Sequence, residues 1–191
     1  MNTLDTMQNP QQNVSPRPTG VRYGLMAGLI LIAIALAFHV TGMIDYTQQN
    51  SAMTWISSLL SYGVMIGAAV LGMKKHREDL GGYLTFGQGF MVGLWETLVI
   101  AAITGIWSVL FFSVVAPDVI DMMIEAARDQ MAEQQGLNDE QIEQAMKITG
   151  WMMQPATLSG IAAFGTLFTG LIISLITAAI MKRNPPMEST I

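Results

Sequence analysis

Long uninterrupted runs of hydrophobic residues dominate the pattern of this chain. They occupy approximately residues 21–43, 53–73, 87–115 and 157–181, and lysine and arginine stay outside them except for Arg22 at one edge. Each run has roughly the 20 residues that a helix needs to cross a hydrocarbon core of about 30 Å. Because backbone amides find no water partner in lipid, the runs should be helical. The pattern therefore predicts an all-α protein, a bundle of four transmembrane helices.

A polar but periodic segment, residues 117–150, separates the third run from the fourth. Pro117 and Asp118 suit the start of a helix, Gly136 suits a stop, and Asn138 with Gln141 resembles a capping box. We expect an acidic helix–turn–helix here. Its carboxylates could form a cap that docks a partner or attracts cations, but a solvated helical surface is the favoured interpretation. They are Asp118, Asp121, Glu125, Asp129, Glu133, Asp139, Glu140 and Glu143.

The ends of the chain and its basic residues predict the topology. Residues 1–20 are polar and rich in Pro, Asn and Gln, which is typical of a disordered tail. A cleavable signal peptide is a weaker alternative, because the first apolar run is long. Residues 21–183 would form the membrane domain, and residues 184–191 a second tail. Seven of the nine basic residues flank one side of the spans, so both termini are expected to be cytoplasmic, with the acidic segment extracytoplasmic.

Composition narrows the function classes. Of 191 residues, 51% are hydrophobic and only 12% are charged, well below the roughly one quarter of soluble domains. The chain has no cysteine and two histidines, which disfavours thiol chemistry and metal sites. Its net charge of −5 argues against a nucleic-acid partner. We find no phosphate-binding loop, serine elbow or metal-binding helix pair. We therefore expect neither enzyme activity nor a cofactor, and the lipid bilayer as the main partner.

Small residues recur at four-residue spacing in all four runs. In membranes such ridges let helices approach closely, although glycine is also simply frequent in membrane helices. We interpret the ridges as helix-packing surfaces. The glycines assigned to them are Gly20, Gly24 and Gly28, Gly63 and Gly67, Gly89 and Gly93, and Gly170, the last in a ridge with Ala162, Thr166, Ser174 and Ala178.

One acidic residue, Glu96, lies inside the third run. It follows Gln88 by eight residues, or roughly 12 Å along a helix, and burying an ionised carboxylate at that depth costs at least about 2.5 kcal/mol. Spacing assigns it to one helix face with Gly89, Gly93, Ile100 and Ile103.

We hypothesise that Glu96 is neutral, because desolvation disfavours its charged form, and that it hydrogen-bonds to Ser174 or Tyr62. These three residues form the candidate intramembrane polar site. The alternative is a proton- or cation-coupling carboxylate in a transport path.

The stretches "YLTFGQGFMVGLWETLVIAAITGIW", "LNDEQIEQAMKIT" and "FGTLFTGLIISLITAAIMKR" resemble a family of small four-span bacterial membrane proteins, domain-of-unknown-function family 4199. The resemblance covers about residues 20–183. It implies an integral protein of the bacterial inner membrane and no particular activity. We expect a helical-bundle scaffold or accessory subunit, with a second copy of itself or another membrane protein as the candidate partner. The alternative is a subunit of a small oligomeric transporter or channel that uses Glu96.

Overall fold

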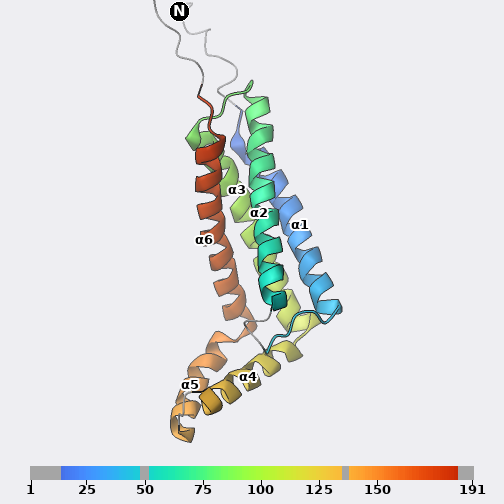
Figure 1. Cartoon of the computed structure of the whole chain (residues 1–191), viewed down its shortest axis with the longest axis vertical. Helices are drawn as coiled ribbons and strands as arrows, with labels where there is room; N and C mark the ends of the chain where they lie inside the picture. The colour runs from blue at the N-terminus through green and yellow to red at the C-terminus, as the bar shows by residue number, and fades with distance from the viewer. Residues whose placement is uncertain (1–13, 48–51, 135–137, 185–191) are drawn as a thin grey trace, which may run out of the picture. The chain divides into compact units, whose positions relative to one another are not determined.

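The chain is almost entirely helical in a computed structural model that describes residues 14–47, 52–134 and 138–184 (Figure 1). Four helices, one of them extended by a π-helical turn at Phe111–Val115, are long and apolar enough to cross a membrane, as the sequence predicts. The described residues contain no strand beyond an isolated bridge between Leu84 and Arg183. The helices are α1 (Pro16–Val40), α2 (Ala52–Asp79), α3 (Phe86–Leu110), α4 (Asp118–Gln134), α5 (Asp139–Met152) and α6 (Pro155–Met181).

Helix α1 begins earlier than hydrophobicity alone predicts. Ser15 caps it by accepting a hydrogen bond from the Arg17 amide at 3.4 Å, and Pro16 takes the first helical position, where its missing N–H costs nothing. Residues 16–20 are therefore helical rather than part of a disordered tail. Residues 1–13 and 185–191, which were predicted to be tail, lie outside the described residues.

Helix α2 extends past its predicted end at residue 73 as far as Asp79. Gly81 and Gly82 then adopt φ values of 78° and 99°, and the Gly82 amide donates to the Arg77 carbonyl at 2.8 Å. Glycine accepts such left-handed angles without strain and ends the helix. The consequence is that the sequence "KKHRED", which looks like a loop between spans, is helical.

The described chain divides into two compact units, and α1, α2, α3 and α6 each contribute to both. The described residues of unit 1 are 14–27, 64–100 and 167–184. A buried cluster of side chains from α2, α3, α6 and the α2–α3 loop forms its core. The members are Met73, Leu80, Leu84, Val92 and Ala178. The backbone of Leu84 also pairs with Arg183, by hydrogen bonds of 2.8 and 2.9 Å, which ties the α2–α3 loop to the end of α6.

The described residues of unit 2 are 28–47, 52–63, 101–134 and 138–166. Helices α4 and α5 contact each other, and Ile142 is buried. The predicted capping box is present, with Asn138 and Gln141 exchanging side-chain-to-backbone hydrogen bonds. The two helices of the predicted helix–turn–helix are thus confirmed, while Gly136, the predicted stop, lies outside the described residues.

Candidate functional site

Helix α1 approaches α3 at the glycine ridge within unit 1. A Cβ placed on Gly24 would lie 2.7 Å from the carbonyl oxygen of Glu96, and one on Gly20 would lie 2.7 Å from the Cβ of Trp95. The Arg17 guanidinium covers the Trp95 ring, 4.9 Å from its centroid. Because any side chain at these glycines would collide with α3, glycine sets the spacing between the two helices. Gly28 continues the ridge in unit 2, against Ile103.

A second seam joins α3 to α6 in unit 1. Gly89 lies against Ala178, Gly93 against Ser174, and Gly170 against Thr97. The Ser174 hydroxyl donates to the Gly170 carbonyl at 2.7 Å and lies 3.4 Å from the Thr97 hydroxyl. Helix α3 is therefore contacted along two separate lines, by α1 on one and by α6 on the other.

Helix α2 does not use its predicted ridge. A Cβ placed on Gly63 or on Gly67 would meet no atom within 4 Å among the described residues, so the four-residue spacing overestimates their packing. Gly72, which lacks a glycine four residues away, is the close contact instead. Its Cβ position lies 3.4 Å from Val92 and 3.5 Å from both the Tyr23 ring and Oε2 of Glu96.

Glu96 is buried where these contacts meet, with 2% of its surface exposed. Its backbone faces α1 at Gly24 and its carboxyl group reaches α2 at Gly72. Oε2 has no hydrogen-bond partner among the described residues. The predicted common face is wrong in one respect, since Gly89 and Gly93 face α6 while Glu96 lies between α1 and α2.

The two predicted partners of this carboxyl group have other environments. Ser174 is buried but directs its hydroxyl to Gly170 and Thr97, so no bond to Glu96 Oε2 forms. Tyr62 belongs to unit 2, and 46% of its surface is exposed. The tyrosine that shares the Gly72 contact with Glu96 is Tyr23.

A second buried titratable residue, His76, was not anticipated. It is 0% exposed, and neither ring nitrogen has a hydrogen-bond partner among the described residues. One pattern indicates that His76 is buried. The buried positions of α2 recur at helical spacing, and this spacing continues past residue 73, where the apolar run ends. These positions are Met65, Ala69, Gly72, Met73 and His76.

Comparison with known proteins fits this architecture. The family model described as "Protein of unknown function (DUF4199)" matches residues 22–183, which include all of α2 to α6 together with Gly24 and Glu96, but neither Arg17 nor Gly20. The chain belongs to the DUF4199 family. No curated protein and no solved structure matches it.

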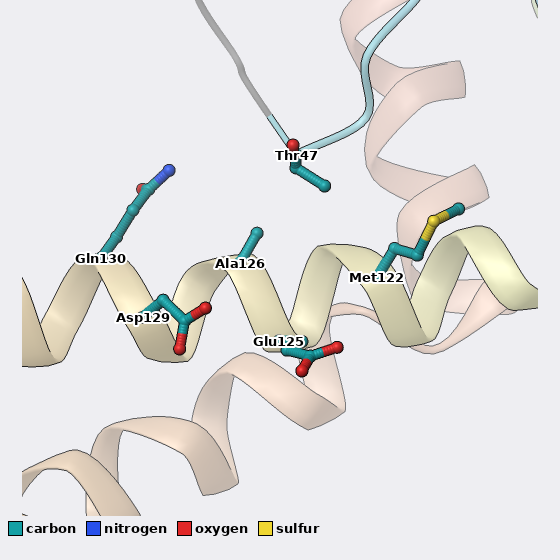
Figure 2. Close-up of a pocket in the computed structure, with 6 residues that line it drawn as sticks. All are labelled: Thr47, Met122, Glu125, Ala126, Asp129 and Gln130. Atoms are coloured by element: carbon teal, nitrogen blue, oxygen red, sulfur yellow. The ribbon is translucent and has the colours of Figure 1, made fainter. Parts of the chain in front are cut away.

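This DUF4199 protein also has an open hollow of about 360 Å³ beside α4 in unit 2, lined by Thr47, Met122, Glu125, Ala126, Asp129 and Gln130. Figure 2 shows Ala126 and Gln130 on the side of α4 that faces Thr47, while Glu125 and Asp129 leave α4 on another side. Across the described part of the chain, no three His, Asp or Glu side chains are grouped to hold a metal ion.

The DUF4199 site in unit 1 is a buried carboxyl group, that of Glu96, enclosed by closely packed helices. Glycines at Gly24 and Gly72 bring two helices against Glu96, and this leaves little room for side-chain rearrangement. A buried carboxyl group without a partner is costly when ionised, and within a membrane it is by default a candidate functional group. The arrangement can hold, accept or release a proton at Oε2.

Proposed function

We propose that this multi-pass membrane protein is a helical-bundle scaffold or accessory subunit without catalytic activity, which presents the acidic helices α4 and α5 to a partner. The observation that carries the proposal is the close contact of α3 with its neighbours, through backbone atoms of Glu96 at Gly24 of α1 and through the Ser174 side chain of α6 at Gly93. Helices locked along two lines form a stiff platform, and stiffness suits a subunit that positions another protein.

The distribution of charge supports an orientation for this platform. Basic residues gather at the start of α1, the end of α2 and the end of α6, whereas α4 begins with Asp118 and Asp121. By the positive-inside rule the termini would be cytoplasmic and α4 and α5 extracytoplasmic. The membrane we propose is the inner membrane of a bacterium, which is what the family resemblance implies. The acidic helices would then be available to an extracytoplasmic region of a membrane protein or to a second copy of the chain.

The second candidate is a subunit of an oligomeric transporter or channel, and the burial of Glu96 favours it. A stiff scaffold has no need of a buried carboxyl oxygen without a partner. A proton- or cation-coupling residue has such a need, because it must change its protonation or ligands during transport. Four helices rarely enclose a path alone, so this function requires assembly.

Photocrosslinking in native membranes tests the scaffold. A crosslinking amino acid at Glu125 or Glu140, both on exposed acidic surface, should give a discrete protein adduct, and one at the exposed Phe168 of α6 should give mainly lipid adducts. The absence of protein adducts from both acidic positions would contradict the proposal.

Reconstitution separates the two candidates. The scaffold predicts that vesicles containing the purified protein show no proton flux that depends on Glu96. The transporter predicts a flux that the conservative change Glu96→Gln abolishes while the melting profile by circular dichroism stays unchanged. Gln144→Ala, an exposed change on α5, is the control and should preserve any flux.

A further inference from the structure

Unit 1 contains two buried titratable side chains, Glu96 and His76. Oε2 of Glu96 and both ring nitrogens of His76 lack hydrogen-bond partners among the described residues. Buried polar atoms are nearly always paired, and a neutral imidazole has one donor and one acceptor to satisfy. Two unsatisfied groups in one unit point to a shared function.

One face of α2 relates the two groups, because it carries both His76 and the glycine that meets Glu96. Gly72 and His76 are four residues apart and therefore share a helix face, separated by roughly 6 Å along the axis. The Cβ position of Gly72 is 3.5 Å from Glu96 Oε2, and the missing side chain leaves this point of α2 open to the carboxyl group. On this face of α2, beyond the point where Glu96 meets Gly72, the imidazole of His76 is therefore the next buried titratable group, whereas Lys74 and Lys75 are exposed.

The same helix continues to the surface of unit 1. Asp79 follows His76 by three residues, at the end of α2, and its side chain is 34% exposed. It pairs with Lys75 at 2.6 Å. Two buried groups, Glu96 of α3 and His76 of α2, are therefore followed by the exposed carboxylate of Asp79 at the end of α2.

We propose that His76 is a proton relay between the buried Glu96 carboxyl group and the exposed end of α2 at Asp79. A protonated Asp79 carboxyl group gives its proton to one nitrogen of neutral His76 and becomes a carboxylate. The imidazolium then releases the proton of its other nitrogen to the Glu96 carboxylate, which becomes a carboxylic acid. Neither ring nitrogen of His76 is hydrogen-bonded to a residue of the described chain, so each transfer requires a bridging water, and the reverse sequence carries a proton out.

No other buried group competes for this role within the described part of unit 1. The charged or titratable groups on the corresponding parts of the surrounding elements are Arg17, Arg22 and Tyr23 of α1, Lys74, Lys75, Arg77, Glu78 and Asp79 of α2, Tyr83 of the α2–α3 loop, Glu96 of α3, and Lys182 and Arg183 around the end of α6. Among them only Glu96 is buried as His76 is. The buried polar residues that α6 contributes to unit 1, Ser174 and Thr177, do not titrate near neutral pH.

The relay rests on the proton-coupling candidate above and is independent of the scaffold. Infrared spectroscopy of the full chain in vesicles tests it, since the carbonyl stretch of a protonated carboxyl group shifts when the medium is changed to D2O. The band that Glu96→Gln removes belongs to Glu96. The rate at which the Glu96 carboxyl group exchanges its proton for deuterium should fall about a hundredfold in His76→Gln, because an acid–base group is lost. His39→Gln, which changes the other histidine, should leave the rate unchanged, and imidazole should restore it in His76→Ala.

Wild-type exchange in His76→Gln would overturn the relay, as would the absence of a Glu96 carboxyl band at every pH at which the protein is folded. A second measurement observes the His76 ring directly, without replacing it. In ¹⁵N-histidine-labelled His39→Gln, nuclear magnetic resonance of the remaining ring should show exchange between tautomers that stops in Glu96→Gln, whereas a ring fixed in one tautomer would also overturn the relay. A vesicle flux that requires Glu96 but not His76 would refute the relay and leave proton coupling standing.

Discussion

At the scale of single residues, two glycines that both belong to four-residue ridges, Gly24 and Gly67, differ in how closely other atoms approach them. A methyl group on Gly24 would lie 2.7 Å from the Glu96 carbonyl oxygen and 2.9 Å from Val99 Cβ, whereas one on Gly67 would meet nothing within 4 Å in the described chain. We expect Gly24→Ala to lower the free energy of unfolding by about 1–3 kcal/mol through overpacking. Gly67→Ala should leave the free energy of unfolding unchanged or raise it by about 0.5–1 kcal/mol, because alanine suits an open helix position better than glycine. Unfolding in mixed micelles measures both, and equal losses would show that α1 does not depend on Gly24.

The sequence identifies Glu96 at this scale but not its neighbours. Each four-residue step advances about 40° around a helix, so a ridge such as Gly89, Gly93 and Thr97 drifts, and Glu96 points about 100° away from Thr97. Spacing within one helix cannot decide which partner helix each side meets. The burial of His76 was not predicted, because the basic residues on either side of it are typical of a loop between spans.

At the scale of elements, the capping box of α5 is a local device with a measurable effect. The Asn138 side chain accepts from the Gln141 amide at 2.9 Å, and the Gln141 side chain accepts from the Asn138 amide at 3.1 Å. Asn138→Ala should cost about 0.5–2 kcal/mol and speed hydrogen exchange in the first turn of α5. Gln144→Ala, a control within the same helix, should not do so, because alanine favours helix interiors. Equal exchange in the two variants would mean that contact with α4, rather than the cap, holds this turn.

The elements themselves were largely predictable, because the cost of unpaired backbone in lipid leaves helices as the structure for long apolar runs. Their ends were less so. Ser15 and Pro16 start α1 inside what hydrophobicity assigns to a tail, and Gly81 and Gly82 stop α2 beyond its apolar run. End signals of this kind depend on local hydrogen bonds, which a hydropathy pattern does not record.

At the scale of the whole molecule, the proposed topology makes one prediction on which both candidate functions depend. The chain contains no cysteine, so a single introduced cysteine is the sole target of a maleimide. We chose two exposed positions, Ala132 on α4 and Asn184 after α6. In intact cells an impermeant maleimide should label Ala132→Cys and should reach Asn184→Cys only after the membrane is permeabilised, because the positive-inside rule puts the end of α6 in the cytoplasm. Labelling of Asn184→Cys from outside would reverse the orientation, place the acidic helices in the cytoplasm, and make the Asp79 end of α2 open to the extracytoplasmic side.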